Sequence, residues 1–225
     1  MSLRLTKKGR RLVVRIVTLA AVITTLAGIA LISYPFYTDR KAREQQAELA
    51  RDFQSSALRT AYERGSVPSA SPLTRLVIPR LRVDTIVVEG VSQKALDTGA
   101  GHYPTTPLPG EPGNVAIAGH RNTFGKPFAE LDKLRPGDRI SVLTPIGQHT
   151  YEMVPPFDNH PNPWVTQPED VDVLSPTSEA MLTLTTCHPK GSARQRLIAR
   201  LKLVESSPSG TLSALDDFPP PQVIR

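Results

Sequence analysis

The sequence predicts an all-β domain, a closed or nearly closed barrel of antiparallel type, that follows an N-terminal membrane helix. Three observations support this prediction. Between residues 73 and 205, seven or eight short segments rich in Val, Ile and Thr alternate with turn signals, and no long helical pattern separates them. The chain has 22 prolines and only 5% aromatic residues, which argues against a helical bundle. Residues 16–38 carry no charge and are long enough to cross a bilayer.

The beginning of the chain has the charge pattern of a membrane anchor. The uncharged run of 23 residues at 16–38 follows a basic tail at 1–15. Basic residues beside a membrane helix stay on the cytoplasmic side. We therefore expect a single-pass protein of the cell membrane with a cytoplasmic N-terminus and an extracellular remainder. The basic residues of the tail are Lys7, Lys8, Arg10, Arg11 and Arg15, among others.

A cleaved signal peptide is the alternative interpretation of this segment. Gly28 and Ala30 are small residues at the spacing of a cleavage site. The apolar run continues beyond them, however, and contains Tyr34 and Tyr37, which are typical of a membrane interface. We favour an uncleaved signal anchor.

Two segments flank the predicted barrel. Residues 39–72 are predicted to be a juxtamembrane helix and a linker, because apolar residues recur at three- to four-residue spacing up to Ala61 and a stretch rich in Ser and Pro follows. A solvated stalk is favoured over a partner-binding helix. Residues 206–225 are polar and proline-rich, and we expect a disordered tail.

Within residues 73–205, apolar and polar residues alternate with the period of a half-buried strand. Residues 139–143 and 150–154 are expected to pair as a hairpin, and residues 128–134 to form one or two short helical turns. Residues 155–176 contain six prolines and Trp164. A loop of this length is usually functional or disordered. The expected strands are 74–78, 82–89, 114–120, 139–143, 150–154, 182–187 and 195–205.

Charge and cysteine content limit the classes of function. The net charge is +6, but several basic residues crowd the first fifteen positions. This distribution argues against a nucleic-acid partner for the domain. A single cysteine excludes an intramolecular disulfide, so packing alone must hold the fold together.

That cysteine, Cys187, lies at the end of a predicted strand. Leu182 and Leu184 alternate with Thr183, Thr185 and Cys187. If the leucines face a core, the thiol shares the accessible face with the threonines. A buried structural cysteine is the ordinary interpretation of an isolated thiol. Its position in a polar strand end nevertheless raises the question of reactivity, because a thiol used only for packing is easily replaced.

A reactive thiol needs a base or a cationic neighbour, because only a few per cent of it is thiolate at neutral pH. His120 is the last residue of the strand 114–120 and lies on the face that carries small residues. This position in the alternating pattern is consistent with a catalytic pair of His120 and Cys187. His188 is adjacent to Cys187 in sequence but points to the other face of the strand. For the remaining histidines we expect structural or solvated roles; they are His102, His149 and His160.

A third group is needed to stabilise an oxyanion or to orient the acyl donor. Arg194, Arg196 and Arg200 all fall on one face of the last predicted strand. Parity therefore cannot choose among them. A solvated strand face is the ordinary interpretation of each one taken alone.

Together these residues resemble the signature of the sortase family. Ala-Gly-His-Arg at 118–121, Thr-Leu-Thr-Thr-Cys-His-Pro at 183–189 and Arg-Gln-Arg-Leu-Ile at 194–198 occur in the order of that family. The sequence is most similar to class E sortases of high-GC Gram-positive bacteria. The resemblance covers residues 73–204 and includes the N-terminal anchor.

The resemblance implies an all-β, eight-stranded sortase-like barrel with short helical turns, and a cysteine transpeptidase. Cys187 then corresponds to the nucleophile that attacks the Thr–Gly carbonyl of a sorting signal, and His120 to the acid/base. Arg196 matches the family's arginine by its place nine residues after the cysteine. The implied partners are secreted proteins with LAXTG- or LPXTG-type sorting signals, the amine of a peptidoglycan precursor, and the membrane.

Further roles follow from the same resemblance. Thr186 resembles the threonine that contributes a main-chain donor near the oxyanion. The 155–176 loop corresponds to a wall of the sorting-signal groove, so Trp164 and Val165 are candidates for substrate binding. No cofactor is expected, and no metal, because we see no acidic cluster like the calcium site of some class A enzymes. A second hydrophobic segment and an Asp-Pro-aromatic lid, expected of class C enzymes, are not evident.

Two other classes of function remain open. A membrane-tethered cysteine hydrolase would use the same three residues with water as the acyl acceptor. A non-catalytic surface module would contain Cys187 as a structural residue.

Overall fold

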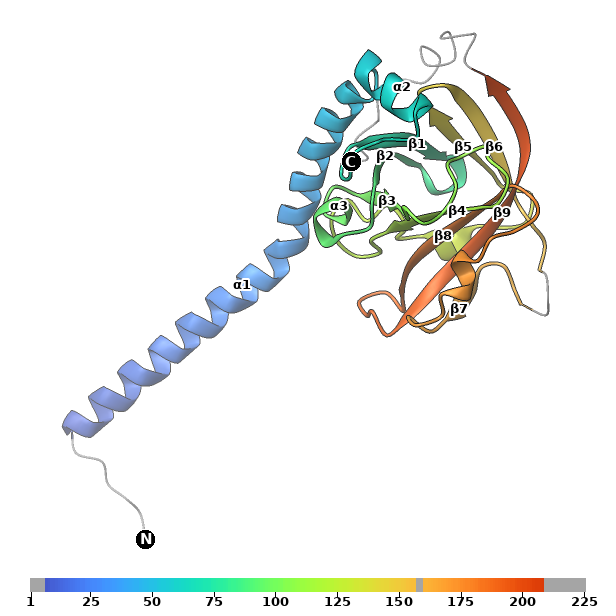
Figure 1. Cartoon of the computed structure of the whole chain (residues 1–225). Helices are drawn as coiled ribbons and strands as arrows, with labels where there is room; N and C mark the ends of the chain where they lie inside the picture. The colour runs from blue at the N-terminus through green and yellow to red at the C-terminus, as the bar shows by residue number, and fades with distance from the viewer. Residues whose placement is uncertain (1–6, 157–159, 209–225) are drawn as a thin grey trace. The chain divides into compact units, whose positions relative to one another are not determined.

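The computed structural model describes residues 7–156 and 160–208. The chain consists of two compact units, Met1–Tyr37 and Thr38–Arg225. The second unit is mostly β-structure, as predicted, and its strands form one sheet (Figure 1). The strands are β1 (Pro72–Ile78), β2 (Val83–Glu89), β3 (Ala100–His102), β4 (Asn114–Gly119), β5 (Arg139–Thr144), β6 (Gly147–Met153), β7 (Trp164–Thr166), β8 (Met181–His188) and β9 (Gln195–Pro208).

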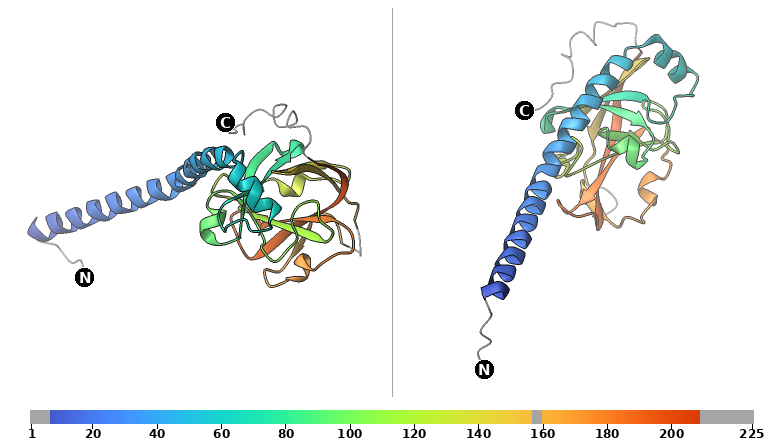
Figure 2. Two further views of the ribbon diagram at one scale, coloured as in Figure 1. Left: turned by 45° about the horizontal axis from the view of Figure 1, so that its top comes forward. Right: turned by 90° about the vertical axis from the view of Figure 1, so that its left-hand side faces the viewer.

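The sheet closes on itself because β9 is long enough to have two neighbours on one edge. Its beginning pairs with β7, and its end pairs with β6 from Leu201 onward. β8 pairs along the other edge. The order is β6-β5-β1-β2-β3-β4-β8-β9, and the β6–β9 pairing makes these eight strands a closed barrel, with β7 added beside β9. The predicted eight-stranded barrel is confirmed, and Figure 2 shows it from two further sides.

Alternate residues of the strands fill the barrel with apolar side chains. In β8, Leu182 and Leu184 are fully buried in this core, as the alternating pattern predicts. Each such side chain contributes about 1.5–3 kcal/mol by leaving water. The residues between the leucines therefore point away from the core.

The strands differ from the prediction in three places. The segment around His102, which lies outside the expected strands, forms β3, a glycine-containing strand in which a Cβ on Gly101 would lie 2.1 Å from the carbonyl oxygen of Gly90. The barrel is mixed rather than purely antiparallel, because β2–β3 and β4–β8 are parallel pairs. β9 continues to Pro208, so residues 206–208 of the expected tail are strand; residues 209–225 lie outside the described part.

One continuous helix, α1 (Lys7–Asp52), contains both the apolar run and most of the predicted juxtamembrane helix. Among the described residues it is the one helix long and apolar enough to cross a membrane. Its end is no solvated stalk, which corrects our expectation. Phe53 packs with Leu58 and Ile86, and the side-chain amide of Gln46 hydrogen-bonds both backbone groups of Ile86. Apolar spacing alone did not distinguish a stalk from a helix that packs on the barrel.

The remaining elements are short. α2 (Ser56–Glu63) begins at Ser55, whose hydroxyl accepts a hydrogen bond from the Leu58 amide. The predicted helical turns within 128–134 correspond to η2 (Leu131–Lys133). The long 155–176 loop contains β7 and η3 (Asp172–Leu174). The others are η1 (Pro79–Leu81) and α3 (Gln93–Leu96).

Candidate active site

Cys187 lies near the end of β8, on the face away from the barrel core. The thiol is free and half-buried. Its neighbours on the same face are Thr185 and Thr183, whereas Leu184 points into the core. A structural cysteine would lie on the core side, so the parity of β8 favours an accessible, reactive thiol.

Arg196 lies directly across from Cys187. The two residues are partners in the antiparallel register of β8 and β9. Side chains of opposite residues share a face and have Cβ atoms about 4.5–5.5 Å apart. The guanidinium now donates to the carbonyl oxygens of Ala193, at 3.0 Å, and Gln195, at 3.1 Å. Arg196 thus stands beside the thiol, and among the described residues no carboxylate pairs with it.

Arg200, the second arginine on this face, has a structural environment. It pairs with Thr183 in the register, four residues before Cys187. Its guanidinium donates to the Val173 carbonyl at 2.9 Å and lies 5.5 Å from the centre of the Trp164 ring. Arg194 precedes β9 and is exposed. The structure therefore favours Arg196, a choice that strand parity left open.

His120 follows β4, the parallel neighbour of β8. The register pairs Ala118 with Thr185, and two residues further along each strand stand His120 and Cys187. Neighbouring strands lie about 4.7–4.9 Å apart, and this register, continued by two residues beyond β4, predicts that the two side chains share one face. Burial lowers the pKa of His120 below its usual value, and the charge of Asp97 opposes this shift. Among the described residues, its Nε2 atom is buried without a hydrogen-bond partner.

Thr186 connects the two strand ends from the other face. Its buried hydroxyl donates to the carbonyl oxygen of Gly119 at 2.8 Å. Gly119 must lack a side chain, because a Cβ there would lie 2.7 Å from the ring of Phe128. This bond fixes the residue before His120 against the residue before Cys187.

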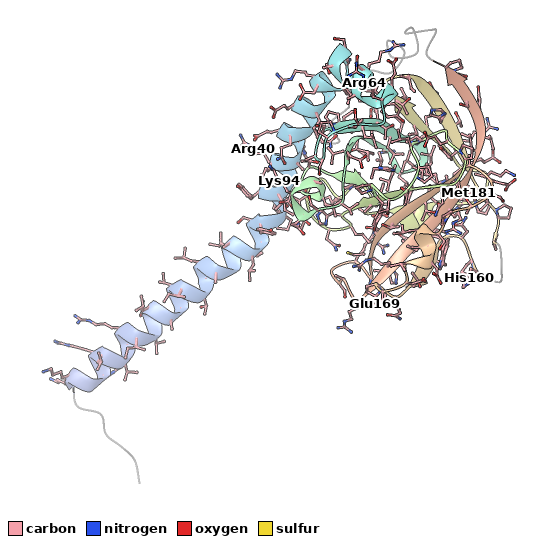
Figure 3. The ribbon with its side chains drawn as sticks, viewed as in Figure 1. Arg40, Arg64, Lys94, His160, Glu169 and Met181 are labelled. Carbon is pink, nitrogen blue, oxygen red and sulfur yellow. The ribbon has the colours of Figure 1, made fainter. Side chains whose placement is uncertain are left out.

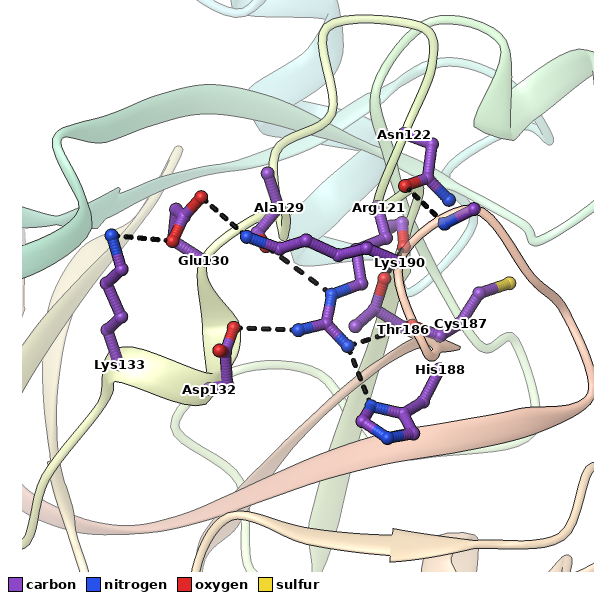
Figure 4. A network of polar contacts seen from close by, with 12 residues as sticks. Arg121, Asn122, Ala129, Glu130, Asp132, Lys133, Thr186, Cys187, His188 and Lys190 are labelled. Carbon is purple, nitrogen blue, oxygen red and sulfur yellow. Dashed lines mark hydrogen bonds and ion pairs between the residues drawn. The ribbon is translucent and has the colours of Figure 1, made fainter.

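Arg121 forms a second connection beneath the site (Figure 4). Its side chain is 3% exposed and donates to Asp132 at 2.7 Å. It also donates to the carbonyl oxygen of Cys187, at 3.3 Å, and to Nδ1 of His188, at 2.9 Å. Arg121 thereby attaches the segment after His120 to the end of β8. Figure 4 also shows Cys187 and His188 pointing in different directions, as the sequence predicts.

The other histidines lie away from Cys187. His102 is buried, and its Nδ1 lies 2.9 Å from a carboxylate oxygen of Glu89. His160 is exposed beside the ring of Trp164. His149 lines a separate pocket of about 390 Å³ at the turn between β5 and β6, where none of the site residues named above is a lining residue. Burial lowers the pKa of His149.

Besides Thr186, two substrate-binding residues were predicted, Trp164 and Val165, and they occupy different faces of β7. Trp164 pairs with Ile198 and packs against it and Val173, on the face that carries Arg196. Val165 pairs with the core residue Leu197 and is 41% exposed. Only Trp164 therefore shares the face of Cys187. Substrate contact by either residue stays a prediction.

No metal site lies near these residues. Over the described residues, no group of three or more His, Cys, Asp and Glu side chains is arranged to hold a metal ion.

Comparison with known proteins agrees with this geometry. A family model described as the sortase domain matches residues 76–204. The chain belongs to the sortase family. Sortases are cysteine transpeptidases, and the family prediction is confirmed.

Among curated relatives, the chain is 34% identical over 188 residues to sortase SrtE1 of Streptomyces coelicolor, covering 77% of this chain and 52% of that protein. It therefore spans about half the length of SrtE1. With sortase D of Bacillus subtilis it is 28% identical over 193 residues, covering 81% of this chain and 92% of the relative. The predicted likeness to class E sortases is confirmed.

Solved structures of sortases have the same fold. A sortase D5 transpeptidase of Clostridium perfringens superposes with a TM-score of 0.61 at 29% identity, covering 75% of this chain and 99% of that one. Sortase E1 of S. coelicolor, crystallised with a tripeptide in its active site, superposes with a TM-score of 0.56 at 36% identity, covering 65% and 97%.

Two residues close to the candidate site were not identified from the sequence. Arg121 follows His120, so strand parity places it toward the core. A charged residue at an inward position indicates a buried ion pair, and this signal could have identified Arg121. Tyr103 places its hydroxyl 3.4 Å from the Thr185 hydroxyl, on the face of Cys187. Nothing in the spacing around Tyr103 marks it, because β3 itself was not predicted.

Proposed function

We propose that this sortase is a membrane-anchored transpeptidase that cleaves a C-terminal LAXTG- or LPXTG-type sorting signal between Thr and Gly. It then transfers the protein to the amine of a cell-wall precursor. The observation that supports the proposal is the strand register, which pairs Cys187 with Arg196 and, extended by two residues beyond Ala118 and Thr185, predicts His120 on the same face.

In the first half-reaction the Cys187 thiolate attacks the Thr–Gly carbonyl carbon and forms a tetrahedral oxyanion. The Arg196 guanidinium is the donor nearest in the register to stabilise this charge. As the C–N bond breaks, His120 donates its proton to the amine of the leaving glycine. The products are a Cys187 thioester and the released C-terminal peptide.

In the second half-reaction the neutral imidazole of His120 removes a proton from the incoming amine. The amine nitrogen attacks the thioester carbonyl, and the collapse of the intermediate expels the Cys187 thiolate. A new amide bond has replaced the Thr–Gly bond, and the proton is again on His120. Burial lowers the pKa of His120 and so disfavours its charged form, which means that the protonated imidazole depends on the neighbouring Cys187 thiolate for stabilisation. Among the described residues, no group occupies Nε2 of His120 with a hydrogen bond.

The tripeptide bound to S. coelicolor sortase E1 supports a peptide substrate for this chain as well. The apolar stretch of α1 and the basic tail support anchoring in the cell membrane, with the barrel outside the cell.

The direct test uses peptides that contain each sorting motif, incubated with the full-length protein with and without triglycine, and analysed by mass spectrometry. We expect cleavage after Thr and ligation to triglycine, and a thioester adduct of the protein at short times. Cys187→Ala and His120→Gln should abolish both products while the fluorescence of the single tryptophan, Trp164, stays native.

The same experiment separates the alternatives. Free acid as the sole product at high triglycine concentration would identify a hydrolase. Undiminished cleavage by the Cys187→Ala variant would identify Cys187 as a structural residue.

A further inference from the structure

The loop that follows His120 contains three successive residues with left-handed backbone conformation. The φ angles are +52° at Phe124, +72° at Gly125 and +39° at Lys126. Glycine adopts this region freely, but other residues pay about 1–2 kcal/mol each. Such conformations persist where neighbouring groups hold them, and they cluster at functional sites. The contacts that hold this loop are therefore informative.

One carboxylate of α1 holds the loop. Oδ1 of Asp39 accepts a hydrogen bond from the Gly125 amide at 3.0 Å, and Oδ2 accepts one from Nζ of Lys126 at 2.8 Å. The Asp39 side chain is 12% exposed, whereas that of Lys126 is 49% exposed. Charge-assisted bonds to a shielded carboxylate are stronger than neutral ones. Asp39 thus binds both the strained backbone and the side chain of this loop.

Asp39 is itself held firmly against the barrel. Ala42 and Gln46 lie three and seven residues further along the same face of α1. The Gln46 amide accepts from the Ile86 N–H at 2.7 Å and donates to the carbonyl oxygens of Ile86 and Thr98, each at 2.9 Å. By contrast, Arg40, the residue directly after Asp39, points to solvent, pairs with Glu44 and has a side chain that is 83% exposed (Figure 3).

The same loop contacts His120 at two points. The Phe124 ring lies 5.2 Å from the His120 ring, centre to centre, at a tilt of 32°. The Phe128 amide donates to the His120 carbonyl oxygen at 3.2 Å, which closes the loop on the backbone of His120. Because Nε2 has no partner in the described chain, this ring contact bears on the orientation of the imidazole.

We propose that Asp39 is a positioning residue for His120. It acts through Phe124–Lys126, so the juxtamembrane end of α1 is part of the active-site architecture. This inference rests on the proposed function, in which His120 is the acid/base. Cys187 lies on β8, outside this chain of contacts, so loss of Asp39 should impair His120 without altering access to the thiol.

The test compares variants of the full-length protein in detergent. Asp39→Ala should lower kcat for peptide ligation about ten- to a hundredfold, the scale of a small displacement of a catalytic group. KM and the fluorescence of Trp164 should stay as in the unmodified protein. The imidazole of His120, followed by NMR titration, should change its pKa. Lys126→Met should produce a smaller loss, and Arg40→Ala, the matched control, should have none.

Three outcomes would overturn the inference. One is an Asp39→Ala variant with unchanged kcat and unchanged His120 titration. Another is a loss in which kcat falls, KM rises and the Trp164 fluorescence changes together, which indicates general disruption. If Asp39→Ala fails to fold, Asp39→Asn and Lys126→Met decide, and full activity of both is the third contrary outcome. Full activity of His120→Gln would instead refute the proposed function. If His120→Gln is inactive but Asp39→Ala is fully active, the proposed function stands and only the role of Asp39 is refuted.

Discussion

Arg196 and Arg194 are separated by one residue, yet only Arg196 stands opposite Cys187 in the β-ladder. Arg196→Ala should lower kcat about 10²–10³-fold, the usual effect of removing an oxyanion donor. Arg196→Lys should recover only part of this loss, because an ammonium lacks the planar fork of the guanidinium. Steady-state ligation kinetics measure both effects. Arg194→Ala is the control and should stay within about twofold; equal losses in the two alanine variants would contradict the assignment.

Two half-buried histidines, His120 and His149, should make the stability of the protein depend on pH. Burial lowers the pKa of both His120 and His149 below 6.5, so the unfolded chain binds these protons first as the pH falls. The free energy of unfolding should therefore decrease between pH 7 and pH 5 and level off below the folded-state values. Glu130 does not act in this window, because hydrogen bonds from Lys133 and Lys190 hold its pKa at about 2.

Urea unfolding at several pH values, followed by Trp164 fluorescence, measures this slope. His120→Gln and His149→Gln should each reduce it, since glutamine does not titrate. A double variant with the slope of the unmodified protein would exclude the two imidazoles as its source.

Strand parity predicted the residue-scale geometry of the site. A period of two in the sequence is enough to separate Leu184 from Cys187 and to reject His188. Parity could not choose Arg196, because that choice depends on which residues β7 and η3 bring against Arg200. Long-range contacts of that kind leave no local pattern.

At the scale of elements, β8 and the segment after β4 are joined by the buried guanidinium of Arg121. Asp132→Asn should destabilise the barrel by about 2–3 kcal/mol, because it leaves that charge without its counterion. This loss of unfolding free energy is smaller than for a fully buried ion pair, because the Asp132 side chain is 46% exposed. Urea unfolding measures it.

The control for this change is an exposed ion pair on the same barrel. Lys202 and Glu179 are 47% and 58% exposed, and Glu179→Gln should cost less than about 1 kcal/mol. If Asp132→Asn costs no more than Glu179→Gln, Arg121 does not depend on its counterion.

Elements with a strong hydrophobic periodicity were predicted correctly, whereas elements whose position depends on contacts with distant residues were missed. β8 and the hairpin of β5 and β6 follow from alternation and turn residues. β3 has three residues, one of them the glycine required by the approach of Gly90, so it carries no alternating signal. The end of α1 has the spacing of any amphipathic helix, and only the Gln46 and Asp39 contacts identify the barrel as its partner.

At the scale of the whole molecule, the single cysteine reports which side of the membrane the barrel occupies. The basic tail predicts a cytoplasmic N-terminus and an extracellular Cys187. A membrane-impermeant maleimide should therefore label Cys187 on intact cells. In a Cys187→Ser, Ser2→Cys variant the introduced thiol should react only after permeabilisation. If labelling of Cys187 required permeabilisation, the predicted orientation would be wrong. If the mature protein lacked its N-terminal segment, the segment would be a signal peptide cleaved at the small residues near Gly28, and not an uncleaved anchor.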